Sequence, residues 1–88
     1  MSTKNLLQLA ATYGSPLYVY DTEKIISQYN SIINAFANVK NVKINYAVKA
    51  LSNISILKVF KQLNSGLDTV SIQEVKLGLL AGFDPKDI

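Results

Sequence analysis

The chain has 88 residues, enough for one small domain and too few for two. Hydrophobic residues make up 49% and charged residues 17%, a composition typical of a folded globular chain and not of a disordered one. The net charge of +3 comes from lysines that are scattered along the sequence, so we expect no basic patch of the kind that binds nucleic acid. Cysteine and histidine are absent, which excludes disulfides, Cys-His and Ser-His-Asp catalysis and most zinc sites within these residues; we expect no metal site.

The sequence carries no targeting or membrane segment. The first residues lead into a mixed polar and apolar stretch, unlike the apolar core of a signal peptide. No apolar run approaches the ~18 residues that a membrane span requires. We therefore expect a soluble, cytoplasmic protein with no membrane partner.

Residues 1–40 predict a helix, a strand and a second helix. Apolar side chains at helical spacing follow a possible serine or threonine cap, and Gly14 ends this first helix. After a Ser-Pro pair, the aromatic and β-branched residues 17–20 predict a short strand. The second helix begins after Asp21 or Thr22 and carries a wide apolar stripe, formed by Ile25, Ile26, Tyr29, Ile32, Ile33 and Phe36.

From residue 42 onward the pattern alternates between strands and helices. Residues 42–48 predict a strand, and a helix follows behind a cap at Ser52 or Asn53. Residues 67–71 predict a second strand. This part of the chain therefore contains the first strand, helix and strand of a β-α-β-α series with short loops.

The last predicted helix begins with a capping-box pattern. Ser71 and Glu74 have the spacing of a capping box, and Gly82 ends the helix with Pro85 just beyond it. Two β-α units of this kind are typical of a parallel sheet covered by helices, an α/β fold. Because two units cannot close a barrel, we expect the chain to be the amino-terminal part of a larger protein.

Lys49 ends the first predicted strand, where the chain turns into a helix. A lysine that is partly buried there loses hydration of its charged form, which makes its amine a better nucleophile and suits it to Schiff-base chemistry. The alternative is an ordinary solvated lysine in a loop. Strand alternation puts two sets of side chains on opposite faces: Ile44, Tyr46 and Val48 on one, and Asn45, Ala47 and Lys49 on the other.

Four segments of the chain resemble one superfamily of enzymes. YAVKA at residues 46–50 resembles the cofactor-lysine motif of the alanine-racemase-like, β/α-barrel pyridoxal-phosphate enzymes. YGSPLYVYD at 13–21, GLDTVS at 66–71 and AGFDPKDI at 81–88 are similar to further segments of that superfamily, and they occur in the expected order. Within it, the chain looks most like the diaminopimelate decarboxylase family of amino-acid decarboxylases.

The resemblance implies the amino-terminal part of a pyridoxal-phosphate-binding (β/α)8 barrel of the TIM type. Residues 41–88 would be its first two βα units. Residues 1–40 would precede it as a helix-strand-helix segment, and the strand at 17–20 would join a second, β-rich domain built mainly from the carboxyl-terminal part of the enzyme. The full enzyme would be a homodimer.

The resemblance also implies roles for individual residues. Lys49 would be the catalytic residue and would hold pyridoxal 5'-phosphate as an internal aldimine, which the amino-acid substrate displaces before it loses CO2. The reaction implied is that of meso-diaminopimelate to L-lysine, in lysine biosynthesis. Asp68 would lie near the cofactor lysine, although it also fits an ordinary aspartate at a loop entry. Ser71 and Glu74 are best explained as a helix cap.

Three alternatives stay open at this point. One keeps the barrel and changes the substrate to ornithine, arginine or carboxynorspermidine. Another is a non-catalytic pyridoxal-phosphate-binding barrel protein, against which the early strand at 17–20 argues. The third is a helix-rich interaction module with no cofactor. The phosphate cradle and the substrate-binding residues are expected downstream of Ile88, so the 88 residues alone are predicted to be inactive.

Overall fold

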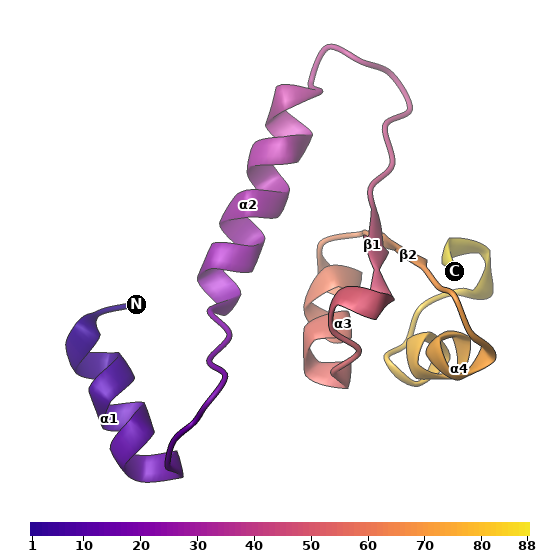
Figure 1. Ribbon diagram of the computed structural model, residues 1–88. Coiled ribbons are helices and arrows are strands. Elements are labelled where there is room, and N and C mark those ends of the chain that lie inside the picture. The colour runs from indigo at the N-terminus through magenta and orange to yellow at the C-terminus, as the bar shows by residue number, and fades with distance from the viewer.

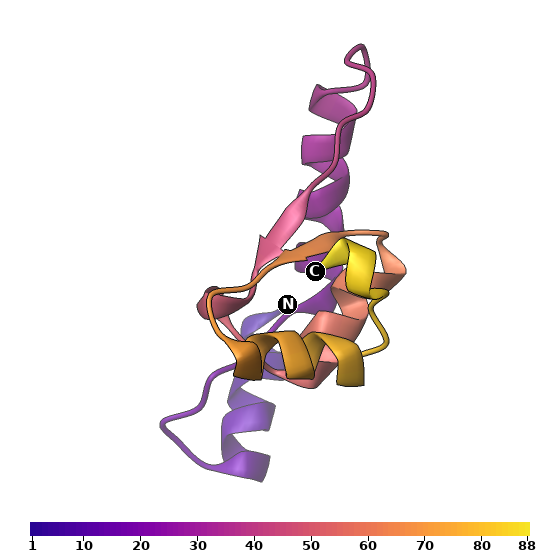
Figure 2. The same cartoon turned by 90° about the vertical axis from the view of Figure 1, so that its right-hand side faces the viewer.

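The computed structural model describes residues 1–88 and shows four α-helices, two short strands and two single-turn 3-10 helices (Figure 1). The radius of gyration is 15.2 Å, against about 12 Å for a compact chain of this length. The molecule is elongated because the first two helices extend away from the other elements (Figures 1 and 2). In chain order the elements are α1 (Thr3–Tyr13), α2 (Thr22–Ala35), β1 (Asn45–Ala47), η1 (Val48–Ala50), α3 (Ile54–Gln62), β2 (Gly66–Asp68), α4 (Ile72–Leu80) and η2 (Pro85–Asp87).

The predicted helices are all present, and each begins where the sequence offers a polar cap. In every case the side-chain oxygen of the cap accepts a hydrogen bond from a backbone N–H in the first turn, which satisfies a donor that the helix itself cannot pair. The caps are Ser2, Asp21, Asn53 and Ser71. The predicted stops at Gly14 and Gly82 are confirmed as well, since both glycines have positive φ angles of 86° and 97° that favour glycine.

The two strands form a parallel pair, as the β-α-β-α pattern predicts. Asn45 is paired with Gly66 and Ala47 with Asp68, and α3 makes the crossover between the strands. Glycine suits position 66, because a Cβ atom there would overlap the Asn45 side chain and approach the backbone carbonyl oxygen of Asp87. The paired strands, with α3 and α4 packed against them, make up the α/β part of the molecule (Figure 2).

The hydrophobic core lies between this strand pair and the helices α3 and α4. Its five buried members are Val48, Leu57, Leu67, Ala81 and Phe83. Val48 and Leu57 have no exposed surface at all. Partly buried side chains close the cluster from its sides, among them Tyr46 from β1, Phe60 from α3 and Leu77 from α4.

Residues 17–20 pair with no strand of these 88 residues, so the predicted strand, which is expected to join a β-rich domain further along the enzyme, stays a prediction. The segment has no regular secondary structure here, and its side chains are exposed, with Tyr18 at 89%. A strand needs a neighbour to pair its backbone groups, and no other strand of these residues lies beside this segment. Aromatic and β-branched composition therefore identified a segment suited to a sheet but could not supply its partner.

The other two strands are shorter than predicted. Residues 42–48 and 67–71 were the expected bounds, whereas β1 covers Asn45–Ala47 and β2 covers Gly66–Asp68. Beyond β1 the chain bends at once into η1, so Val48, the last residue of the predicted strand, belongs to a turn. None of the helices combines the length and the hydropathy that crossing a bilayer requires.

Candidate functional site

Lys49 and Asp68 lie at the same edge of the strand pair. Asp68 is the last residue of β2, its register partner Ala47 is the last residue of β1, and Lys49 follows two positions later in η1. Carboxyl ends of parallel strands meet at one edge of a sheet, and this edge is where ligand sites of α/β proteins are built. The structure therefore brings the two predicted site residues to one edge.

The face alternation predicted for the first strand is confirmed within β1. Tyr46 packs against the core, and its register partner Leu67 is buried. Asn45 and Ala47 belong to the opposite face, which is also the face of Gly66 and Asp68. Ala47 has a small side chain on this face, whereas the place beside Gly66 is occupied by the Asn45 side chain.

Lys49 is not partly buried, which corrects the expectation for its environment. Its side chain is exposed, and so is that of Asp68. The two ion pairs of the molecule are Met1–Asp21 and Lys43–Asp87, so Lys49 and Asp68 are not paired with each other. The physical reason is that η1 carries Lys49 past the end of the strands, where no other element of these 88 residues covers it.

The turn that bears Lys49 is held in place on both sides. Val48 precedes Lys49 and is completely buried. The backbone N–H of Leu51 donates to the carbonyl oxygen of Val48 at 3.1 Å, which closes the single turn of η1. Asn53 then caps α3 by accepting from the Ser55 N–H at 2.9 Å. An exposed amine is thus displayed on a fixed length of backbone.

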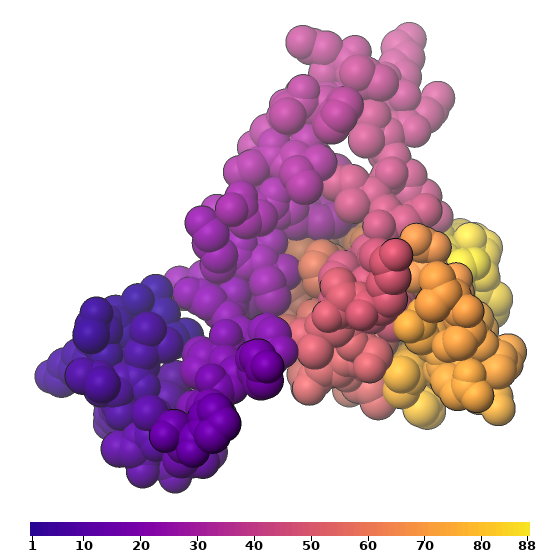
Figure 3. Space-filling model, in the orientation of Figure 1, coloured from indigo at the N-terminus to yellow at the C-terminus, as the bar shows by residue number.

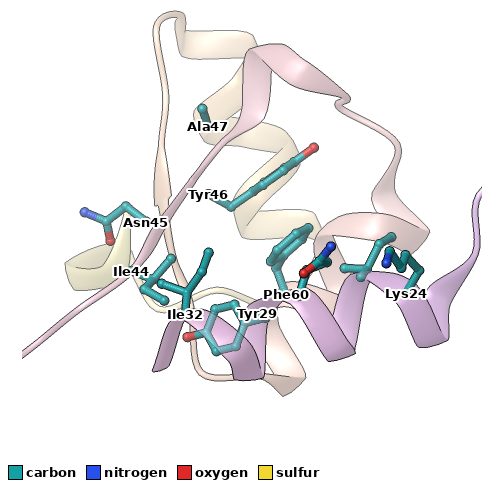
Figure 4. Close-up of a pocket in the computed structure, with 10 residues that line it drawn as sticks. Lys24, Tyr29, Ile32, Ile44, Asn45, Tyr46, Ala47 and Phe60 are labelled. Carbon is teal, nitrogen blue, oxygen red and sulfur yellow. The ribbon is translucent and has the colours of Figure 1, made fainter. Parts of the chain in front are cut away.

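Tyr46 adds a second connection across this turn. Its hydroxyl group donates to the carbonyl oxygen of Leu51 at 2.9 Å, while its ring stacks on Phe60 with the centroids 4.0 Å apart and the planes 13° from parallel (Figure 4). Burial is the main cause that raises the pKa of the Tyr46 hydroxyl, so the group is protonated at neutral pH and acts as the donor.

The largest cleft lies beside β1 and not over Lys49. It has a volume of about 400 Å³ and runs between α2, β1 and α3, with a mostly apolar lining that includes Tyr29, Ile32, Ile44, Tyr46 and Phe60 (Figure 4). Neither Lys49 nor Asp68 lines this cleft or any other. In the space-filling view, α1 and the segment after it form a lobe that projects from the rest (Figure 3). Because no cleft of the 88 residues includes Lys49 or Asp68, this chain alone does not enclose a cofactor at that edge.

Ser71 and Glu74 act as the predicted helix cap. The Glu74 N–H donates to Ser71 Oγ at 3.2 Å, and the N–H of Val70 donates to Glu74 Oε1 at 2.8 Å. In a standard capping box the Glu side chain accepts from the N–H of the cap residue itself. Here Glu74 accepts instead from Val70, one residue before Ser71. Both side chains are occupied by the start of α4, next to the edge that carries Asp68.

The residues at this edge fit the covalent part of a pyridoxal-phosphate site. An exposed primary amine is the group that condenses with an aldehyde, and Lys49 provides it on a fixed turn beside the small Ala47. Asp68 adds a carboxylate at the end of the adjacent strand. Sequence patterns did not predict the hydrogen bond from the Tyr46 hydroxyl to the Leu51 carbonyl oxygen. No spacing rule describes a side chain that bonds to the backbone five residues ahead, across a turn.

Comparison with known proteins places most of the chain in one family. Residues 22–88 match the model of the pyridoxal-dependent decarboxylase family that describes its pyridoxal binding domain. A diaminopimelate decarboxylase from Methanothermobacter thermautotrophicus is 37% identical over 83 residues, 93% of this chain and 19% of the relative. One from Helicobacter pylori strain J99 is 43% identical over 84 residues, 96% of this chain and 20% of the relative.

A third relative gives the same coverage. The diaminopimelate decarboxylase of Pseudomonas aeruginosa is 37% identical over 83 residues, which are 94% of this chain and 20% of the relative. The chain thus spans about a fifth of the length of the curated relatives it matches.

Proposed function

This chain belongs to the pyridoxal-dependent decarboxylase family, and on that premise we propose that it forms the amino-terminal part of a decarboxylase that converts meso-2,6-diaminopimelate to L-lysine and CO2. The relatives named diaminopimelate decarboxylase, which match nearly the whole chain, support this substrate. The observation that carries the proposal is the exposed amine of Lys49, fixed by η1 at the carboxyl edge of two parallel strands.

In this proposal Lys49 binds pyridoxal 5'-phosphate covalently through Nζ. The cofactor would supply an electron sink for decarboxylation. Lys49 Nζ would lie at the same edge throughout, held by the turn between Val48 and Leu51, and would carry a proton to or from the reacting atoms. Asp68 lies at the end of the adjacent strand and would place a carboxylate at the same edge as the bound cofactor.

The strand pair is proposed to be the start of a (β/α)8 barrel. In support, β1 and β2 are parallel, α3 connects them, and α4 follows β2 in the order that such a barrel requires. The divisions at 1–40 and 41–88, a cytoplasmic location and a homodimer stay predictions. The remaining strands would cover the edge that carries Lys49 and would bring the phosphate-binding and substrate-binding groups.

The test is turnover by the full-length protein that carries these residues. We expect it to release CO2 from meso-diaminopimelate and to form L-lysine, and we expect Lys49→Ala to lower kcat at least ~1,000-fold, as loss of a covalent catalyst does. Lys58→Ala is the matched control, since Lys58 is an exposed lysine on α3 away from the edge. Its turnover should equal that of the wild type.

Three results would contradict this proposal. Preferred turnover of ornithine, arginine or carboxynorspermidine would show that the substrate is wrong. Binding of the cofactor without turnover of any of these amino acids would show a non-catalytic binding protein. Undiminished turnover by Lys49→Ala would show that another group holds the cofactor. The 88-residue chain by itself is expected to form no lysine.

A further inference from the structure

Tyr46 and Leu51 bracket Lys49 on the chain and are joined by a hydrogen bond. Tyr46 lies three residues before Lys49 and Leu51 two residues after it, and the Tyr46 hydroxyl donates to the Leu51 carbonyl oxygen at 2.9 Å. The backbone that carries the lysine is therefore closed into a loop by a side chain. A second, shorter closure is made within it by the bond from the Leu51 N–H to the Val48 carbonyl oxygen.

The hydroxyl group can act as a fixed point because its ring cannot move freely. The ring stacks on Phe60 at 4.0 Å, and Phe60 in turn meets the ring of Tyr29 from α2 edge-on at 6.4 Å (Figure 4). Such aromatic pairs add to the stability of the packing beyond the area that they bury. Three elements, α2, β1 and α3, thus set the position of the Tyr46 oxygen atom.

We propose that Tyr46 is a positioning residue for Lys49, and that its hydroxyl fixes the turn from which the lysine amine reaches the reacting atoms. This inference rests on the proposed function of Lys49. Groups that react must be held within a fraction of an ångström of their productive geometry, and supporting hydrogen bonds from packed side chains provide this precision. Within these 88 residues the Lys49 side chain is exposed, and the backbone turn that carries it is closed by hydrogen bonds from Tyr46 and Leu51.

Tyr46→Phe separates this role from a simple contribution to packing. The variant keeps the ring that stacks on Phe60 and removes only the donor to Leu51. Tyr29→Phe is the matched control. Tyr29 belongs to the same aromatic cluster and is more deeply buried than Tyr46, but its hydroxyl makes no hydrogen bond to the rest of the chain.

The first measurement is hydrogen exchange on the cofactor-free full-length protein. The Leu51 amide is protected by its bond to Val48. Losing one hydrogen bond that supports the turn should speed exchange of this amide about fivefold in Tyr46→Phe. Tyr29→Phe should exchange like the wild type. Equal exchange of the Leu51 amide in all three proteins would overturn the positioning role.

The second measurement is steady-state kinetics of the loaded enzyme. We expect kcat to fall ~10-fold in Tyr46→Phe with KM changed less than about twofold, since the reacting geometry is disturbed and substrate binding is not. Tyr29→Phe should keep the wild-type values. A kcat for Tyr46→Phe equal to that of the wild type would overturn the inference, whatever its melting temperature.

Borohydride reduction followed by peptide mass spectrometry separates this inference from the proposed function. A pyridoxyl group on Lys49 in the wild type and in Tyr46→Phe, with unchanged exchange and kcat, would leave the proposed function standing and remove the role of Tyr46. A pyridoxyl group on another lysine in the wild type would remove both.

If Tyr46→Phe does not fold, Phe60→Leu takes its place, because it keeps the Tyr46 hydroxyl and removes the ring that supports it. Phe60→Leu should also speed hydrogen exchange of the Leu51 amide, and an unchanged exchange rate would overturn the inference.

Discussion

Nine of the ten buried residues lie beyond residue 47, and only Tyr29 lies before it. In both regions, residues 1–40 and residues 41–88, every α-helix nevertheless begins with a side-chain cap. α1 buries no residue, and α2 buries only Tyr29, against Phe60. In the second region α3 and α4 both pack on the strand pair.

The difference shows that local signals and burial are separate contributions to this fold. Caps and helical periodicity suffice to define where a helix begins and ends. They do not provide a surface for its apolar face. The second region has that surface because α3 and α4 share one core with the parallel strands, whereas most apolar side chains of α1 and of residues 17–20 are exposed. Lys49 stands in the packed region, at its exposed edge.

The largest effect that can test this contrast is loss of a core side chain. Leu57 is fully buried in α3, so Leu57→Ala should lower the free energy of unfolding by about 2–5 kcal/mol. Leu7 is 67% exposed on α1, and Leu7→Ala should change it by less than ~0.5 kcal/mol. Urea unfolding followed by circular dichroism measures both. Equal effects of the two changes would break the contrast between the regions.

A medium effect is expected from the helix caps. Ser71→Ala removes the acceptor for the Glu74 N–H at the start of α4 and should cost about 1 kcal/mol of global stability. Ser2→Ala removes the equivalent bond to the Asn5 N–H in α1. Because α1 is not packed on the core, this change should reduce its helix content without moving the main melting transition. A shift of that transition by Ser2→Ala as large as that by Ser71→Ala would contradict the contrast.

The smallest effect concerns acid stability. The Lys43 ammonium group, which donates to Asp87 at 2.8 Å, holds the pKa of the Asp87 carboxyl below its usual value. A carboxyl with a lowered pKa in the folded state stabilises that state above its unfolded pKa of about 4, and the contribution is lost as the pH falls through the folded value. The ion pair joins the start of the first βα unit to η2.

Asp87→Asn should therefore reduce the loss of stability between about pH 5 and pH 2. The measurement is the urea midpoint at several pH values for both proteins. Asp21 also has a lowered pKa, chiefly because it accepts from the Lys24 N–H at the start of α2. Asp21→Asn should change the acid response of the α2 helix signal more than that of the core. An identical pH dependence of wild type and Asp87→Asn would show that the ion pair contributes nothing.

Much of the fold could be predicted because its signals are local. The caps at Asp21, Asn53 and Ser71 and the stops at Gly14 and Gly82 each act within one helical turn, so neighbouring residues determine them. The parallel pairing of β1 and β2 followed from the β-α-β-α order. The strand predicted at 17–20 has no partner within these residues and stays a prediction, because pairing is not local and composition names no partner.

The positions of the candidate site residues could be predicted, but their surroundings could not. The sequence indicated that Lys49 and Asp68 follow the carboxyl ends of two neighbouring strands, and both lie there, while their roles stay predictions. The exposure of Lys49 was missed, because burial depends on elements that lie outside these residues. The link from Tyr46 to Leu51 was missed for another reason. Alternation assigned Tyr46 to the packed face, and this assignment is correct, but it does not reveal where the hydroxyl group at the end of the ring reaches.

The central claim is that Lys49 is the attachment point of the cofactor, and one measurement tests it directly. The full-length protein loaded with pyridoxal phosphate is reduced with borohydride, digested and mapped by peptide mass spectrometry. We predict a pyridoxyl group on the peptide that contains Lys49 and an unmodified state of every other lysine. A pyridoxyl group on Lys43, Lys58 or a lysine elsewhere in the protein, with Lys49 unmodified, would contradict the claim.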